Sequence, residues 1–130
     1  MDEREFKERT RDVALRVIRM VDALPKSDGS SVIGKQLLRS GTSIGANYRA
    51  ACRSKSTADM IAKMAIVEEE ADETLYWIDL LVAARMIPAN RVASLEKEVN
   101  EILAMIVASI KTLRSKSAAI QNPKSKIQNR

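Results

Sequence analysis

The chain has 130 residues, a mass of 14.4 kDa and a formal net charge of +5, which suits a single domain that buries its own core. Aromatic residues make up 3% and hydrophobic residues 45%, so the core must be built from aliphatic side chains and methionine, which favours packed helices over a β fold. The lack of histidine excludes Ser-His-Asp and Cys-His relays, and the single cysteine, Cys52, excludes an intrachain disulfide and a multi-cysteine zinc site.

The first predicted helix covers about residues 3–24. Apolar side chains recur at helical spacing from Phe6 to Leu24, while arginine and glutamate occupy the other face. Pro25 should end this helix, because proline cannot continue it. The serine-rich segment 26–31 is predicted as a loop whose last serines cap the next helix.

The second predicted helix begins near Val32 and carries glycines on one flank. Gly34, Gly41 and Gly45 share this flank with Cys52. Each glycine lowers helix propensity by about 1 kcal/mol relative to alanine, so something should offset the cost. We expect a close approach by a neighbouring helix, with a kink or a break at one glycine as the alternative.

A basic stripe lies opposite the apolar face of the same helix and forms the candidate nucleic-acid-binding surface. Phosphate contacts from such a stripe would add up in an assembly of identical subunits. The alternative is an ordinary solvated face, and the aromatic residues are too few to stack on bases, so binding would depend on charge and shape. The stripe consists of Lys35, Arg39, Arg49, Arg53 and Lys55.

The third predicted helix follows Ser56, which resembles the first residue of a capping box, and carries an acidic cluster at 68–73. Paired carboxylates can perform acid-base chemistry or bind metals, but without histidine, or inward acids on another helix, we expect no catalytic residue, metal or cofactor and therefore no enzyme. A polar layer that fixes helix register is the preferred hypothesis. Its predicted members are Ser43, Asn47, Glu68 and Asp72.

A second apolar face on the third helix implies a second neighbour. Trp77, Leu80 and Leu81 lie away from the main apolar stripe on a helical wheel. We expect them at a subunit interface, because an exposed face of this kind would be unfavourable on a monomer. The alternative is a helix that packs on two sides within one bundle.

The fourth predicted helix follows the turn at 87–90 and carries an apolar stripe from Val92 to Leu113. The segment 115–130 contains basic but no acidic residues and is predicted to be a flexible tail. Residues 1–114 should therefore form an all-α, antiparallel up-and-down four-helix bundle.

The composition also predicts the compartment and the class of partner. The charged N-terminus differs from a secretory signal, and the longest apolar run, 102–110, is too short to span a bilayer, so we expect a cytoplasmic protein without a membrane partner. The excess of basic residues favours an acidic partner such as RNA. No small-molecule substrate is expected.

Three segments resemble the family of 23S rRNA intervening-sequence proteins. They are Ser40–Asn47, Arg53–Ser56 and Ile66–Glu73, and the resemblance extends over about residues 6–113 by order and spacing of elements. It implies a four-helix bundle that assembles as a homopentamer and is suspected of binding RNA, without an established activity. Accessory proteins of diversity-generating retroelements look similar and bind nucleic acid and a reverse transcriptase.

The sequence departs from the family pattern after Asn47. The family commonly continues with an apolar-Ala-Glu-Gly turn, whereas this chain continues with Tyr48 and Arg49. A role tied to that glutamate cannot be transferred to this chain.

Two functions follow from these observations. The first is a non-enzymatic homo-oligomer, expected as a pentamer, that binds RNA or a ribonucleoprotein through basic surfaces. The alternative is an accessory or scaffold subunit that binds a protein, for example a reverse transcriptase, with incidental positive charge.

Overall fold

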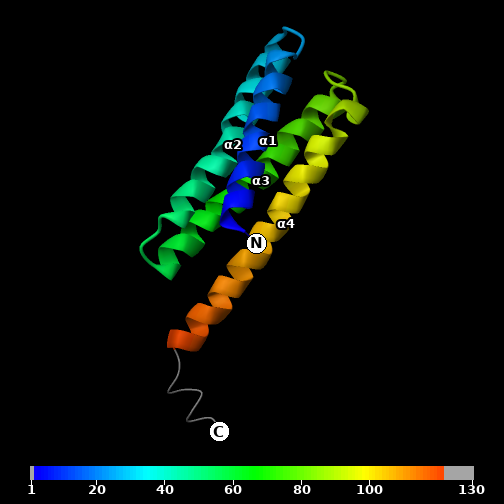
Figure 1. Cartoon of the computed structure of the whole chain (residues 1–130). Helices are drawn as coiled ribbons and strands as arrows, with labels where there is room; N and C mark the ends of the chain where they lie inside the picture. The colour runs from blue at the N-terminus through cyan, green and yellow to red at the C-terminus, as the bar shows by residue number, and fades with distance from the viewer. Residues whose placement is uncertain (1, 122–130) are drawn as a thin grey trace.

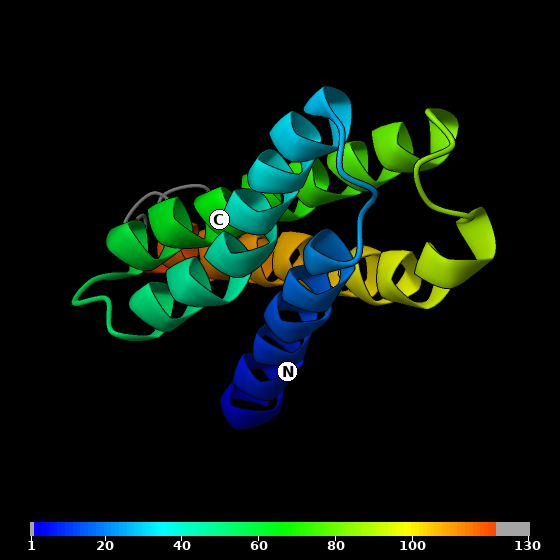
Figure 2. The same ribbon diagram turned by 90° about the horizontal axis from the view of Figure 1, so that it is seen from above.

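Four antiparallel helices form an all-α bundle (Figure 1), as the hydrophobic periodicity predicts. The computed structural model describes residues 2–121. Helix α1 packs on α2, α2 on α3 and α3 on α4, whereas α1 and α4 touch over a smaller area. Seen from above, α1 crosses α4 obliquely instead of lying along it (Figure 2). The helices are α1 (Glu3–Asp22), α2 (Asp28–Cys52), α3 (Thr57–Ala83) and α4 (Ala89–Gln121).

The core between the helices is aliphatic, with one aromatic contact near the α1 N-terminus. The rings of Phe6 and Tyr48 lie 4.4 Å apart between centroids and join α1 to the last turns of α2. Isoleucine, leucine and valine from all four helices fill the rest of the core. None of the helices in the range 2–121 is both long and apolar enough to cross a membrane.

Two helix boundaries differ from the predicted ones, and local chemistry explains both. Helix α2 begins at Asp28 instead of Val32, because Ser27 and Ser30 form a capping box in which each side chain accepts the other's backbone N–H at 3.1 Å. Helix α4 continues to Gln121, so the flexible tail predicted from residue 115 begins too early. No glycine or proline lies between Ala89 and Pro123, so the helix can propagate. Residues 122–130 lie outside the described part of the chain.

The glycine flank of α2 faces α1, and α2 is not broken at any of its glycines. A Cβ atom placed on Gly41 would lie 2.8 and 2.9 Å from the two methyl groups of Val17. A Cβ on Gly45 would lie 3.1 Å from the Thr10 hydroxyl. Close helix approach, and not a kink, is therefore the role of this flank.

Candidate nucleic-acid interface

Arg39 of the predicted basic stripe is paired with two glutamates of α3. The Arg39 guanidinium lies 3.2 Å from a carboxylate oxygen of Glu70 and also donates to Glu73. The hydrogen bond from Arg39 lowers the pKa of Glu73 below its usual value, so this carboxylate is charged at neutral pH. Arg39 therefore connects α2 to α3, and its charge is neutralised at the surface.

Lys35 is also separated from the rest of the stripe. It is exposed at the opposite end of α2, where it lines a shallow hollow together with Asp22 and Asp28. These two carboxylates reduce the local positive potential. The five predicted residues thus do not form one continuous basic surface.

The α1–α2 groove brings Arg49 together with two basic residues of α1 that the sequence analysis missed. Lys7 and Arg11 line this groove from one side and Arg49 from the other, and its volume is about 500 Å³. The floor between them is made of small residues, among them Thr42, Gly45 and Ala46, because α1 and α2 approach closely here. Lys7 and Arg11 lie on the polar face of α1, and only the packing of α1 on α2 places them beside Arg49.

The charges around the groove are unevenly paired. Lys7 lies 3.6 Å from Glu3, and the groove residue Glu8 lies 3.5 Å from Arg4. Arg11 and Arg49 have no carboxylate within 4.0 Å among the residues that the structure describes.

Arg53 and Lys55 continue the basic surface where α2 ends. Arg53 is the C-cap of α2, one turn beyond Arg49, and Lys55 follows in the turn before α3. Both side chains are exposed. Three residues of the predicted stripe, Arg49, Arg53 and Lys55, therefore lie toward the same end of α2, where Lys7 and Arg11 join them.

The predicted polar layer does not form. The Ser43 hydroxyl donates to the Arg39 carbonyl at 2.6 Å, and the Asn47 amide donates to the Ser43 carbonyl at 2.9 Å. Both side chains therefore make their hydrogen bonds within α2 and not to α3. Asp72 is exposed, and half-buried Glu68 makes no hydrogen bond to another described side chain. Glu68 lies beside α4 instead, where it lines a hollow with Lys111 and Arg114.

Ser40 and Thr74 make the buried polar contact between α2 and α3 instead. The Thr74 hydroxyl lies 3.0 Å from the Ser40 hydroxyl, and both residues are 0% exposed. Each hydroxyl also bonds to a carbonyl of its own helix, that of Leu37 or of Glu70. The pair therefore has its polar atoms satisfied without burying a charge.

The predicted subunit interface is only partly exposed. Leu81 is 0% exposed and belongs to the core, so the prediction that it lies on a free surface is wrong. Helix α3 packs on both α2 and α4, and these two helices cover its two apolar faces. Leu80 and Trp77 are half-buried, and the Trp77 indole donates to Glu73 at 3.2 Å. Tyr76, which stacks edge-on against Trp77 at 5.1 Å, is 55% exposed.

Cys52 is a packing residue with low nucleophilicity. Burial is the main factor that raises the pKa of its thiol, which opposes formation of the thiolate at neutral pH. The nearby arginines therefore do not activate it. Within residues 2–121, no group of three or more cysteine, aspartate or glutamate side chains is arranged to hold a metal ion.

Comparisons with known proteins found a matching family model and a similar solved structure. Residues 2–108 match the family model described as 23S rRNA-intervening sequence protein. A crystal structure from Bacteroides thetaiotaomicron, of a protein with unknown function from the S23 ribosomal protein family, is 36% identical with a TM-score of 0.79. The alignment covers 85% of this chain and 99% of that one. No match was found among curated proteins.

Proposed function

Because the chain belongs to the family of 23S rRNA-intervening sequence proteins, we propose that it is a non-enzymatic, homo-oligomeric protein that binds RNA. The observation that carries this proposal is the α1–α2 groove, where Lys7, Arg11 and Arg49 converge from two helices. Arg53 and Lys55 extend the positive surface beyond the end of α2.

The groove suits a sugar-phosphate backbone better than a base. Its basic side chains can donate to phosphate oxygens, and an arginine guanidinium can do so through two N–H groups. Its lining contains no aromatic side chain on which a base could stack. Recognition would therefore follow the shape and charge of a folded RNA, and affinity should fall steeply with salt.

A homo-oligomer, which we propose to be a pentamer, would repeat this surface. Each subunit adds further phosphate contacts to the same RNA, so a weak individual site becomes a strong collective one. The proposed assembly is tested by light scattering of the full chain. A monomer at all concentrations would remove this part of the proposal.

The central experiment replaces the two groove arginines that have no carboxylate nearby, as Arg11→Gln together with Arg49→Gln. Binding to a structured RNA is measured by fluorescence anisotropy at low and at moderate salt. We expect the double variant to lower affinity about tenfold or more at low salt and to reduce the salt dependence.

Arg39→Gln is the matched control. It removes one positive charge from α2, as Arg49→Gln does by itself, but from a guanidinium that already binds two glutamates. We expect RNA affinity close to that of the unchanged protein. Equal affinity of all three proteins would refute the groove as the RNA site, and a larger loss from Arg39→Gln would favour the stripe predicted from sequence.

Exposed Tyr76, packed against half-buried Trp77, favours a protein-interaction subunit as a second candidate function. Exposed aromatic side chains are enriched at protein interfaces, and the Trp77 ring is held in place by its bond to Glu73. This candidate predicts that the full chain has no salt-dependent affinity for RNA. It also predicts that Tyr76→Ser weakens assembly, with itself or with a protein partner, as measured by light scattering.

A further inference from the structure

Helix α3 presents an exposed ridge in which a tyrosine lies between carboxylates. Glu69, Asp72, Tyr76 and Asp79 recur at helical spacing on the side of α3 opposite its buried residues, and all four are exposed. Tyr76 is 55% exposed, with Asp72 one turn before it and Asp79 one turn after it. None of the three acids has a cationic nitrogen within 4.0 Å among the residues that the structure describes. These four residues are called the α3 ridge below.

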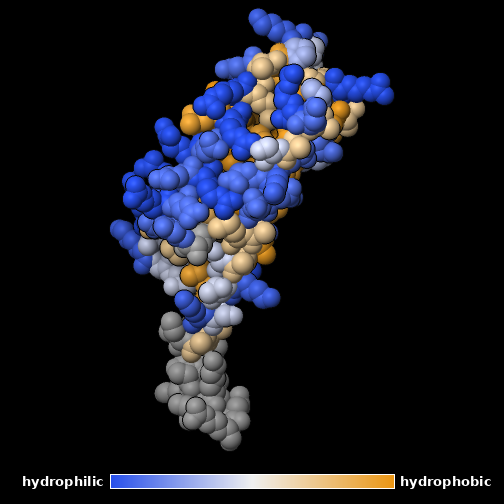
Figure 3. Space-filling model, turned by 45° about the vertical axis from the view of Figure 1, so that its right-hand side comes forward, coloured by the Kyte–Doolittle hydropathy of each residue, from blue (hydrophilic) through white to orange (hydrophobic). Residues whose placement is uncertain are grey.

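A cleft with the opposite charge lies between the C-terminal end of α1 and the start of α4, and is called the α1–α4 cleft below. Its volume is about 340 Å³. On the face drawn in Figure 3, apolar patches lie between hydrophilic side chains in the upper half, where α1 ends and α4 begins. The charged residues that line the cleft are all arginines, Arg16, Arg19 and Arg91. Its apolar lining is Met20, Ala23, Leu24, Met86, Ile87 and Leu95.

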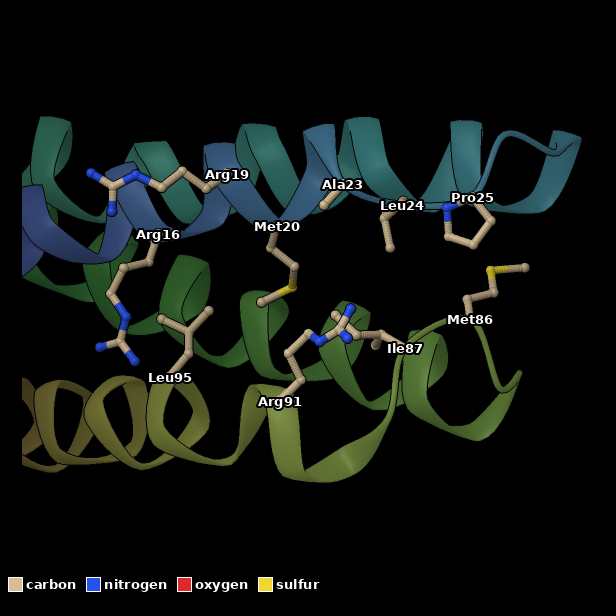
Figure 4. A pocket seen from close by; sticks show the side chains of 10 residues that line it. All are labelled: Arg16, Arg19, Met20, Ala23, Leu24, Pro25, Met86, Ile87, Arg91 and Leu95. Carbon is tan, nitrogen blue, oxygen red and sulfur yellow. The ribbon is translucent and has the colours of Figure 1, made fainter.

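The cleft and the α3 ridge are separate surfaces of the chain. The cleft lies beyond the side-chain contacts that join α1 to α4, in which Arg9 donates two hydrogen bonds to Glu98, at 2.8 and 2.7 Å. Helix α3 lies behind the cleft in Figure 4 and contributes no described residue to its lining. A chain therefore cannot place its own ridge in its own cleft, but a second copy can supply one.

The arginines of the cleft suit two separate carboxylates and not one small anion. In Figure 4 the Arg91 side chain extends from α4 into the gap beside Ile87, whereas the Arg19 side chain runs along α1 away from the gap. Both arginines are exposed, and neither has a carboxylate within 4.0 Å in the part of the chain that the structure describes. Asp72 and Asp79 of the ridge are also apart, by about 10 Å along one helix face. The ridge therefore offers one carboxylate to each guanidinium.

The apolar lining suits the aromatic ring that lies between those carboxylates. Met20 and Met86 supply thioether groups, which make favourable contacts with aromatic rings and adapt to their shape. The Arg91 guanidinium in the gap can also stack on an aromatic face. Tyr76 is the one exposed aromatic residue within residues 2–121. A second copy of the chain therefore carries the side chain that the cleft fits.

We propose that the α1–α4 cleft of one copy receives the α3 ridge of a second copy, with the Tyr76 ring in its apolar part and the two aspartates facing Arg19 and Arg91. This inference rests on the proposed homo-oligomer and names the two surfaces that join its subunits. Because the two surfaces differ, the contact propagates from head to tail until a ring closes. The cleft shares no residue with the α1–α2 groove, so assembly leaves the proposed RNA site open.

Charge reversal on each surface of the full chain tests the proposal by light scattering at matched concentrations. The ridge variant is Asp72→Lys with Asp79→Lys, and the cleft variant is Arg19→Glu with Arg91→Glu. Each variant alone should raise the concentration needed for assembly by about tenfold or more, because like charges then face each other. A mixture of the two variants should assemble again, because each reversed or original ridge then finds a cleft of opposite charge.

Two further variants serve as control and as independent check. Lys97→Glu with Arg114→Glu makes the same change in net charge as the cleft variant, at exposed positions of α4 outside the cleft, and should leave the assembled mass unchanged. Tyr76→Ser alters no charge and should also weaken assembly by about tenfold or more, because the cleft then loses the ring that fills it. Circular dichroism checks that each variant keeps its helices.

Three results would overturn the proposal. They are an unchanged protein that stays monomeric, helical ridge, cleft or Tyr76→Ser variants that assemble as the unchanged protein does, and a mixture of helical ridge and cleft variants that stays unassembled. The first result would also remove the proposed homo-oligomer, but not the RNA affinity that depends on Arg11 and Arg49. The other two would leave the homo-oligomer in place and assign its contact to other surfaces.

Discussion

Gly41→Ala tests whether close contact between α1 and α2 holds the bundle together. The added Cβ would lie 2.8 and 2.9 Å from the two γ-methyl groups of Val17 and 3.2 Å from its Cβ. Val17 is 0% exposed and is branched at Cβ, so a χ1 rotation still leaves a methyl group and Cβ itself close to the added atom. The overlap can be relieved only if α1 and α2 move apart.

The expected loss of stability combines two opposing effects. Alanine is favoured over glycine inside a helix by about 1 kcal/mol. Overpacking a filled core costs about 1–3 kcal/mol, and the rigid Val17 puts this case near the upper end of that range. We therefore expect the free energy of unfolding to fall by about 1–2 kcal/mol and Tm to fall by roughly 5–10 °C.

Thermal unfolding followed by circular dichroism measures this effect at one fixed protein concentration. Gly29→Ala is the matched control, because its Cβ would lie 2.9 Å from the terminal methyl of Met86, nearly the same distance. That methyl is the end of a flexible side chain and can move. We expect this variant to be as stable as the original protein or slightly more stable.

The reasoning is refuted if Gly41→Ala and Gly29→Ala have the same Tm. Val17→Ala provides a further check, because it removes the methyl groups that Gly41→Ala would meet. Alone it should destabilise the core, but combined with Gly41→Ala it should cost less than the sum of the two changes. Strict additivity would show that the two positions do not contact each other.

Three further predictions follow from the ion pairs, the thiol and the acidic cluster. The hydrogen bonds from Arg9 lower the pKa of Glu98 below its ordinary value, so this pair stabilises the fold at neutral pH and the contribution is lost as the pH falls through the folded-state pKa. Glu98→Gln should therefore lower the unfolding free energy in urea by about 1 kcal/mol at neutral pH, and this loss should shrink as the pH falls through the folded-state pKa of Glu98; a loss that does not change with pH would contradict this. Because burial raises the pKa of the Cys52 thiol above its ordinary value, its reaction with a disulfide reagent should be slow at neutral pH and accelerate in urea; equal rates would show an accessible thiolate. Since Glu68 makes no hydrogen bond to another described side chain, Glu68→Gln should change stability by less than about 0.5 kcal/mol, and a loss of several kcal/mol would restore the predicted polar layer.

The fold was predictable because its signals are local or periodic. The apolar spacing in each helix, Pro25 after the first helix and the cap at Ser56 depend on residues close together in the chain. The end of α4 was not predicted, because serine and lysine after Leu113 are typical of both an exposed helix and a tail.

The candidate site was less predictable because it depends on how the helices are turned toward each other. A helical wheel groups Arg39 with Arg49, but it cannot show that Arg39 meets Glu70 and Glu73 of α3 whereas Arg49 lies beside α1. The helical wheel also placed Leu81 outside the core, because a wheel of α3 alone does not show that α3 packs on two neighbouring helices.

The sequence by itself determined that this protein is a bundle of four antiparallel helices with an aliphatic core and a glycine flank for close packing. These properties follow from composition and from a period of about 3.6 residues, which each helix carries in its own residues. Only the tertiary structure decided which charges are free. Arg39 is neutralised across α2 and α3, whereas Arg11 of α1 joins Arg49 of α2 in one groove. Ion pairing depends on distances of a few ångströms between side chains on separate helices. The residue pattern along one helix gives no information about these distances.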